Sequence, residues 1–285
     1  TCMRYIVTFN KSYVVMNGYQ TQAIERIKEL YNQLVNDYIT PNNSGASVDF
    51  SYVTSLKNSV MSILCSGVYD KIFPFWTKAH TKQDVLLYSY QVSLSTQLTM
   101  DDFSIPKSFQ CPQDSAIYVL RTLDDCKNCF EKMKCLKQTS DLIMKSVNKH
   151  QQEENSSSSG NSSSGGSSNM LLNGAATTPP KQEVFTSDEL LPILTYVICQ
   201  SKLPHIASNL SYMTELVIDE MMSTEYGYAL TSFEVALEYM KKRANELGIN
   251  ESTAQTTNLP PPPLTPSLQN WEGGGGGAGG GRSMR

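Results

Sequence analysis

Long apolar runs, blocks of basic residues and histidines are all scarce in this chain of 285 residues. No run of about 18 apolar residues occurs, so we expect no membrane-spanning helix. The net charge is -4 and there is no basic block, which disfavours nucleic acid as a partner. No signal peptide is visible either. The seven cysteines are accordingly expected to be reduced thiols in the cytoplasm.

Motifs for catalysis and for metal binding are also missing. The sequence contains no G-x-S-x-G, no H-E-x-x-H and no phosphate-binding P-loop, which argues against a hydrolase. One C-x-x-C pattern occurs at Cys126–Cys129, with Cys135 beyond it, and the histidines are His80, His150 and His205. A structural zinc site needs four ligands, which here would have to come from scattered positions. We therefore expect neither a metal nor a cofactor, and we place Cys135 on the inward face of its own helix.

Helical periodicity is what the sequence does contain, with no strand pattern of any strength. The clearest segment is residues 19–38, where apolar side chains fall on one face before residues 41–45 break the pattern. Residues 1–18 stay unassigned, since 5–9 and 13–16 could be short strands or part of a disordered lead. The first residue is Thr and not Met, which is compatible with a fragment of a longer protein.

Further helices are expected through the first half of the chain. One should cover about residues 50–69 and be followed by an aromatic loop at 73–76. Thr81 then predicts the cap of another helix, with Asp84 in the third position after it. This succession of helices predicts an all-α protein, built as a layered helical bundle. Two more helical segments are 114–123 and 128–147.

Two segments have compositions that disfavour folding. Residues 150–183 are rich in Ser, Gly and Asn and bury too little apolar surface to offset their ordering entropy. We interpret them as a disordered insert within one helical domain, residues 19–248, the alternative being a linker between two domains. Residues 249–285 are expected to form a disordered tail rich in Pro and Gly. Its run at 259–263 favours polyproline II and could bind a polyproline-binding domain or act only as a spacer.

The stretch from Asp188 to Met240 is the most informative part of the sequence. Residues 190–197 are apolar almost all round, as in a buried helix. Pro192 has no amide hydrogen to donate, so it is placed in the opening turn of this helix, which Pro204 ends. Residues 209–222 carry a second periodic pattern.

A third helix is predicted by a capping box, Thr231 with Glu234, and by a stop at Gly248. Two features of this stretch are not needed for packing. Asp188 lies at the start of a very apolar helix, and the tight Gly227–Tyr228 segment is expected just before the third helix begins. Together they place a carboxylate, a phenol and a hydroxyl beside an apolar surface. This arrangement predicts a site that binds a partner and directs one charged side chain at it.

The spacing of these residues resembles a known family. An Asp four residues before a helix Pro, a Ser-Asn pair and a Tyr-x-x-Thr pattern are Asp188 with Pro192, Ser208–Asn209, and Tyr228 with Thr231. They are similar to the Vps-nine (vacuolar protein sorting nine) domain, the exchange module for Rab-five-type GTPases. The phrases L-P-I-L-T-Y-V-I and G-Y-x-L-T-S most resemble its Ras-and-Rab-interactor branch.

The resemblance covers roughly residues 50–245 and implies guanine-nucleotide exchange on a Rab-five-type small GTPase, without covalent chemistry. Such a GTPase holds its nucleotide through a Lys and Mg²⁺ that neutralise phosphate charge. A carboxylate within ~4 Å of that Lys can take its charge and repel phosphate, a role that the resemblance gives to Asp188. Tyr228 and Thr231 would hold the displaced switch segment. The residues expected to bind the GTPase are Leu191, Pro192, Asn209 and Gly227.

Each of these roles has a plain structural alternative. Asp188 could simply complement the helix dipole, Thr231 could be an N-cap, and Asn209 could cap the second helix. The sequence also departs from the family pattern at Ala229, where a second aromatic is usual, and at Ser232, where Asn is common. These departures put affinity and partner choice in question more than activity.

The resemblance also bears on partners and location. A Rab-five-type partner implies a cytoplasmic protein that is recruited to early endosomes. The main alternative is a helical adaptor that binds a small GTPase without exchanging its nucleotide. A weaker one is a scaffold whose Pro-rich tail is the functional part. In the exchange mechanism, Leu194 and Ile198 could add to the apolar groove, although some of these side chains must face the core.

Overall fold

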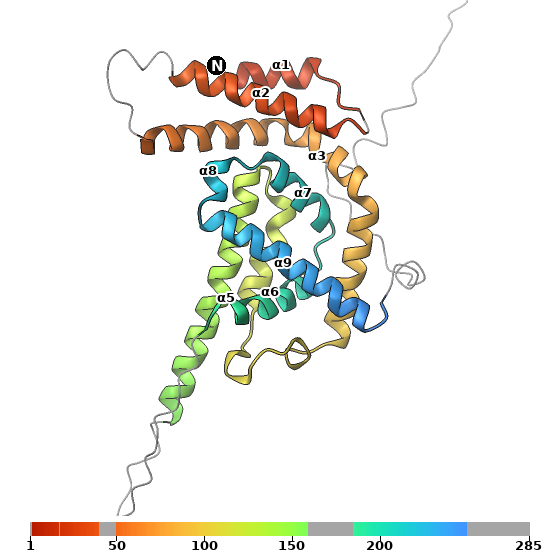
Figure 1. Ribbon diagram of the computed structural model, residues 1–285, viewed down its shortest axis with the longest axis vertical. Helices are drawn as coiled ribbons and strands as arrows, with labels where there is room; N and C mark the ends of the chain where they lie inside the picture. Colours follow the sequence, from red (N-terminus) through yellow and green to blue (C-terminus); the bar gives the residue numbers. More distant parts are fainter. Residues whose placement is uncertain (1, 17, 40–49, 159–184, 250–285) are drawn as a thin grey trace, which may run out of the picture.

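All regular structure in the described part of the chain is helical. The computed structural model describes residues 2–16, 18–39, 50–158 and 185–249. Within these residues there are nine α-helices, three short 3-10 helices and no strand, so the prediction of an all-α layered bundle is confirmed. Figure 1 shows an elongated molecule in which the first helices lie across one end of a helical bundle.

The N-terminal residues form a helix, α1 (Cys2–Ser12), where the sequence left short strands or a disordered lead open. Helix α2 (Gln20–Ile39) confirms the helix predicted for residues 19–38. The buried side chains of α1 recur every three or four residues, which is the period of a helix facing a core. These side chains are Cys2, Ile6 and Phe9.

One long helix, α3 (Phe50–Gln97), replaces the two helices expected in this region, so the predicted loop at 73–76 and the cap at Thr81 are wrong. Pro74 lies inside α3, and Figure 1 shows that the helix bends sharply, as expected where proline removes a backbone hydrogen bond. Thr81 does not cap a helix, because its hydroxyl donates to the carbonyl of Thr77 at 2.7 Å. Two aromatic side chains beside Pro74 are buried in the core, which favours the continuous helix.

The middle of the chain contains α4 (Asp114–Arg121) and α5 (Cys129–Ser158), which confirm the helices predicted at 114–123 and 128–147. Helix α5 continues beyond residue 150, where the insert was expected to begin. The rest of that expected insert, and all but the first residue of the expected tail, lie outside the described residues. Three 3-10 helices flank α4, namely η2 (Asp101–Phe103), η3 (Lys107–Phe109) and η4 (Thr122–Asp125).

Four helices complete the bundle: α6 (Ser187–Ser201), α7 (Ile206–Leu216), α8 (Asp219–Met222) and α9 (Glu225–Glu246). The pattern predicted over 209–222 is thus divided between α7 and α8. The N-cap of α9 is Thr224, whose hydroxyl oxygen accepts from the amide of Tyr226 at 3.3 Å. Because α9 begins there, Thr231 lies in the helix interior and the predicted capping box with Glu234 is wrong. Gly248, which has a positive φ of 69°, lies just after the end of α9, where the sequence predicts the helix to stop.

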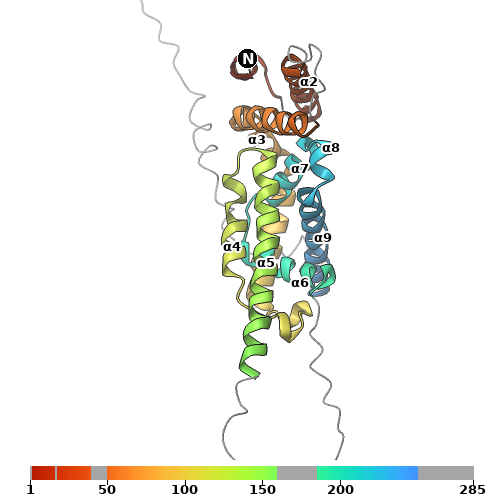
Figure 2. The same ribbon diagram turned by 90° about the vertical axis from the view of Figure 1, so that its left-hand side faces the viewer.

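The arrangement places α6 and α9 against α5. Figure 1 shows both helices beginning on the side where α5 lies, and α6 and α9 also pack on each other. Helix α3 packs against α6 and α7 as well as against α1 and α2, and Figure 2 shows the latter two at the end of the bundle. Among the described residues, no helix has the length and apolar character needed to cross a bilayer.

Candidate functional site

Asp188 is exposed at the start of α6 and does not cap the helix. Thr186 is the N-cap, and its hydroxyl oxygen accepts from the amide of Asp188 at 3.3 Å. The side chain of Glu189 completes a capping box by accepting from the amide of Thr186 at 2.8 Å and from its hydroxyl. These hydrogen bonds from Thr186 lower the pKa of Glu189. The Asp188 carboxylate therefore lies in the first turn, at the positive end of the helix dipole, and faces solvent.

Pro192 lies one turn further into α6 than predicted. The helix begins at Ser187, so Pro192 is in the second turn and not in the opening one. In an α-helix the amide of a residue donates to the carbonyl four residues earlier. Proline at this position removes the hydrogen bond that would otherwise reach the carbonyl of Asp188.

The apolar residues of α6 divide between the core and the surface. Leu194 and Ile198 are buried, so they belong to the core and not to an external groove. Leu191 is partly exposed, as is Pro192 beside it. The hydroxyl of Thr195 donates to the carbonyl of Leu191 at 2.8 Å and approaches the carbonyl of Ala236 in α9 at 3.3 Å. This contact holds the two helices of the site together.

Helix α9 presents Tyr228 and Thr231 to solvent. The side chain of Tyr228 is 53% exposed and that of Val235, two turns on, is 46% exposed, so the two lie on one outward stripe with Thr231. Ala229 and Ser232 are buried next to this stripe, toward the core. The two departures from the family pattern therefore concern packing inside this bundle, because neither side chain reaches the exposed stripe.

Gly227 lies inside the first turn of α9 and not in a turn before the helix. It is buried, and a Cβ atom at this position would lie 2.1 Å from the carbonyl oxygen of Met222 at the end of α8. Only glycine permits this approach. Gly227 thus fixes how closely α8 meets α9, directly before the exposed phenol of Tyr228.

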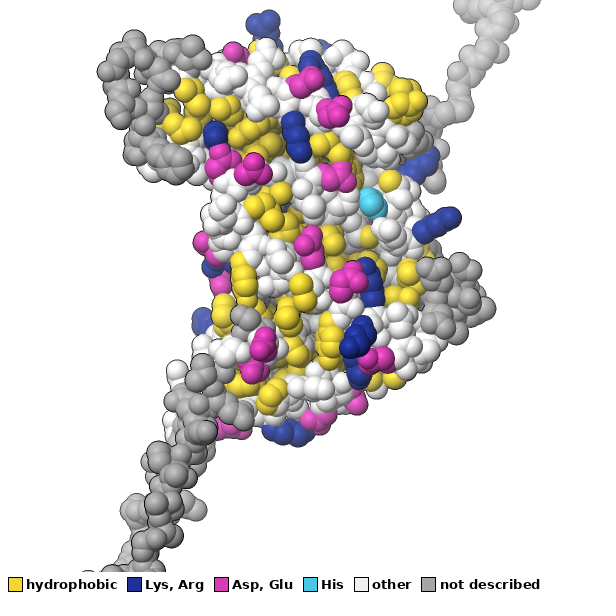
Figure 3. All heavy atoms as spheres, in the orientation of Figure 1, with side chains coloured by type: hydrophobic (Ala, Val, Ile, Leu, Met, Phe, Trp, Pro, Cys, Tyr) yellow, Lys and Arg dark blue, Asp and Glu magenta, His cyan; other side chains and the backbone are white. Residues whose placement is uncertain are grey.

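An apolar surface lies over α5, α6 and α9. Figure 3 shows hydrophobic side chains gathered over this region with acidic groups among them. The exposed members on α5, α8 and α9 are Met144, Met222, Tyr228 and Val235. Soluble proteins use such patches for binding partners. We call this face, together with Leu191 and Asp188, the α5–α6–α9 surface.

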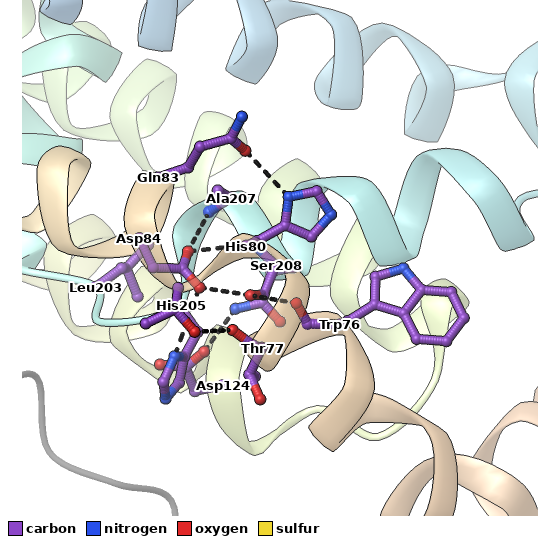
Figure 4. A network of polar contacts seen from close by, with 12 residues as sticks. Trp76, Thr77, His80, Gln83, Asp84, Asp124, Leu203, His205, Ala207 and Ser208 are labelled. Atoms are coloured by element: carbon purple, nitrogen blue, oxygen red, sulfur yellow. Dashed lines mark hydrogen bonds and ion pairs between the residues drawn. The ribbon is translucent and has the colours of Figure 1, made fainter. Parts of the chain in front are cut away.

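Asn209 is not on this surface. It is fully buried in the first turn of α7, where its side-chain amide donates to Asp124 at 2.5 Å and its oxygen accepts from the ammonium of Lys132 at 2.7 Å. It therefore neither caps α7 nor faces a partner. The side chain that caps α7 is Asp84 of α3, which accepts from the amides of Ala207 and Ser208 at 2.8 and 3.1 Å (Figure 4).

Lys132 is a buried cation that the motifs of the sequence do not single out. Its ammonium lies 5.2, 5.0 and 5.9 Å from three aromatic ring centroids, those of Tyr69, Phe73 and Tyr212. Desolvation lowers its pKa to about 8, although nearby Asp124 acts in the opposite direction. A signal was present, because Lys132 falls between inward-facing residues on α5.

Metal ligands do not gather in the described part of the chain. Within those residues, no group of three or more His, Cys, Asp or Glu side chains is placed to hold an ion. All seven cysteines are free thiols, and Cys135 is buried on the inward face of α5, as predicted.

Comparison with known proteins matches part of the chain to a family. Residues 113–245 match the family described as the Vacuolar sorting protein 9 (VPS9) domain. VPS9 domain-containing protein 1 of Homo sapiens is 38% identical over 55 residues, which are 19% of this chain and 9% of that protein. Ras and Rab interactor 2 of Homo sapiens is 33% identical over 73 residues, which are 26% of this chain and 8% of that protein. The mouse Ras and Rab interactor 2 is 36% identical over 63 residues, covering 22% of this chain and 7% of that protein. The chain thus matches less than a tenth of the length of each of these relatives.

Proposed function

Residues 113–245 belong to the VPS9 domain family of Rab guanine-nucleotide exchange factors, and we propose that this protein releases GDP from a Rab-five-type small GTPase. The observation that carries the proposal is the position of Asp188. It is an exposed carboxylate at the start of a buried helix, where Thr186 and not Asp188 performs the capping. The carboxylate is available for a partner.

The proposed mechanism is the replacement of one charge interaction by another. A GTPase holds its nucleotide through a Lys and Mg²⁺ next to the phosphates. The Asp188 carboxylate, brought within ~4 Å of that Lys, competes with the nucleotide phosphates for the positive charge of the Lys. The same carboxylate repels the negatively charged phosphates. The carboxylate lies in the first turn of α6, at the positive end of the helix dipole. GDP then leaves because its strongest charge contacts are lost.

The outward stripe of α9 supplies the second part of the mechanism. Tyr228 and Thr231 are exposed one turn apart, so they can hold a segment of the GTPase that moves away from the nucleotide. Leu191 and Pro192 at the edge of α6 supply apolar contact beside them. Exposed aromatic and apolar side chains surrounded by polar groups are typical of such contact surfaces.

Gly227 and Asn209, both expected from the sequence to bind the GTPase, are buried and support the site from within the bundle. Gly227 is buried against the carbonyl of Met222, so we propose that it fixes the α8–α9 corner. Asn209 is buried beside Lys132 and Asp124, so we propose that it holds α7 against α5. Neither needs to touch the GTPase for its loss to weaken exchange.

The energy source in this mechanism is differential affinity. The protein must bind the nucleotide-free GTPase more tightly than the GDP-bound form, since only that difference shifts the equilibrium. No bond is made or broken on the protein. With a Rab-five-type partner, the protein would work in the cytoplasm and be recruited to early endosomes.

A nucleotide-release assay separates exchange from simple binding. We expect the full chain to accelerate loss of labelled GDP from a Rab-five-type GTPase, and to do so less on Rab GTPases of other classes. An adaptor would instead bind the GTPase in a pull-down while the rate of GDP loss stays at its intrinsic value. That result would overturn the proposal in favour of the adaptor.

A further inference from the structure

Two cysteine thiols meet at the junction of α4, η4 and α5. The thiol of Cys126, which follows η4, donates to the carbonyl of Thr122 at 3.5 Å. The thiol of Cys135, in α5, donates to the carbonyl of Val119 at 3.3 Å and lies 3.9 Å from the hydroxyl oxygen of Thr122. Both sulfurs therefore contact the same turn of chain, although the two cysteines are nine positions apart in the sequence.

The two thiols differ in exposure and in acidity. Cys126 is partly exposed, whereas Cys135 is buried. Hydrogen bonding with Cys135 lowers the pKa of Cys126, and the ammonium of Lys132 lowers it further, against the effect of desolvation. The same interaction with Cys126, together with burial, raises the pKa of Cys135. The exposed thiol is thus the one that ionises first, and the thiolate is the reactive form.

We propose that Cys126 and Cys135 are a peroxide-sensitive thiol pair, in which Cys126 is oxidised first and Cys135 then closes an intramolecular disulfide. Redox-sensitive cysteines of this kind are accessible, have an acidic thiol and lie next to a resolving cysteine. Nothing in the proposed exchange mechanism uses either thiol.

The proposed chemistry takes one hydrogen peroxide for each disulfide. The Cys126 thiolate attacks one peroxide oxygen, so that an S–O bond forms, the O–O bond breaks and hydroxide leaves as water after taking a proton. The Cys135 sulfur then attacks Cys126, the S–S bond forms, and the second hydroxide leaves with the Cys135 proton as water. Both sulfurs are oxidised and both peroxide oxygens are reduced.

A second cysteine pair provides an internal comparison. Cys65 and Cys129 also interact with each other, and the pKa of Cys65 is raised well above its usual value by this contact and by burial. Both are fully buried, and the Cys129 thiol donates to the carbonyl of Leu216 at 3.6 Å. The access needed for reaction with peroxide is absent there, so this pair should stay reduced.

Peroxide treatment of the full chain, followed by alkylation and peptide mass spectrometry, tests the proposal. We expect Cys126 and Cys135 to lose alkylation together, to appear as one linked peptide pair, and to recover after reduction with dithiothreitol. After the same peroxide dose, the chain is unfolded in the alkylating agent, and Cys65, Cys129 and Cys199 should then be alkylated in full.

Two single variants test the order of the steps. In Cys135→Ser, Cys126 should stop at the sulfenic acid and be trapped by dimedone. In Cys126→Ser, Cys135 should keep its thiol at the same dose. The proposal is overturned if Cys135 oxidises equally well without Cys126, or if the folded wild-type chain loses its thiols without a Cys126–Cys135 linkage.

Discussion

At the scale of single residues, Lys132 has a physical consequence that can be measured. Its ammonium is enclosed by aromatic rings, and it donates to the carbonyl of Leu123 at 3.0 Å and to the side-chain oxygen of Asn209 at 2.7 Å. These oxygens and rings stabilise the cation, while desolvation destabilises it. The balance lowers the pKa to about 8 from 10.5.

This shift predicts a stability that rises with pH. Below about pH 8, Lys132 is charged in both the folded and the unfolded state, and the cost of burying the charge is fully present. Between about 8 and 10.5 the unfolded chain holds more protons, so the contribution of this residue to stability rises by roughly 3 kcal/mol in total. Urea unfolding of wild type and Lys132→Met across this range measures it. Equal pH slopes for the two proteins would contradict the assignment.

Among the residues of the candidate site, exposure could be anticipated from the sequence at some positions and not at others. The spacing of Asp188, Tyr228 and Thr231, which resembles the family pattern, predicts exposed side chains, and all three are exposed, while their roles in exchange stay predictions. The burial of Asn209 could not be found, because its partners Lys132 and Asp124 are 77 and 85 residues away in the chain. A polar side chain carries no sequence signal for a partner so far away.

At the scale of elements, the junction of α8 and α9 governs where Tyr228 lies. Gly227→Ala would place a Cβ atom against the backbone of Met222, which cannot move as a flexible side chain can. We expect a loss of about 1–3 kcal/mol in the free energy of unfolding, as for other overpacked sites. We also expect slower nucleotide exchange, since the start of α9 must shift. Thermal unfolding and GDP release measure the two effects. An unchanged melting temperature would show that the junction can accommodate a Cβ atom at position 227.

A second contact holds the same junction from outside the matched family segment. Lys57 of α3 and Glu220 of α8 form an ion pair of 2.5 Å, with their side chains 31% and 30% exposed. Lys57 is the main cause of the lowered pKa of Glu220. A partly exposed pair contributes about 1 kcal/mol or less to stability. Its larger effect should be on the position of α8.

We therefore expect Lys57→Met to reduce exchange efficiency while changing the free energy of unfolding by no more than about 1 kcal/mol. The matched control is Lys127→Met, which removes a similar ion pair of 3.1 Å to Asp70, away from α8. Comparing GDP release by the two variants isolates the contribution of α8. If both variants exchange nucleotide equally well, the ion pair does not position the site.

Element boundaries were predicted less well than element existence, for a physical reason. The periodic segments at 19–38, 114–123 and 128–147 are helices because an amphipathic pattern needs only a core to face. Pro74 and Thr231 both have the local preferences of a helix boundary, yet each lies inside a helix. In both cases local capping or breaking preferences are outweighed by tertiary packing.

At the scale of the whole molecule, the matched VPS9 segment is not the whole packed unit. Helix α3 precedes residue 113 and packs against both α6 and α7. The carboxylate of Asp84 on α3 caps α7, and the amide oxygen of Gln91 accepts from the amide of Leu203 at 2.7 Å. The N-terminal half therefore supports the helices that carry the α5–α6–α9 surface.

The central claim is that the charge of Asp188 drives nucleotide release, and Asp188→Asn tests it most directly. The change keeps the shape of the side chain and deletes the charge. Because the carboxylate is exposed in the first turn and does not cap α6, its loss should cost no more than about 1 kcal/mol of stability. The free energy of unfolding and the circular dichroism spectrum should therefore stay close to those of the wild type. Asp70→Asn, the same substitution at an exposed site on α3, is the matched control.

The measurement is the rate of labelled GDP release from a Rab-five-type GTPase. We predict that Asp188→Asn lowers this rate by roughly tenfold or more, since one preorganised charge at such a site contributes a few kcal/mol. Asp70→Asn should match wild type, and binding of the GTPase to the Asp188→Asn variant should persist through the apolar contacts. A folded Asp188→Asn protein that releases GDP at the wild-type rate would contradict the mechanism.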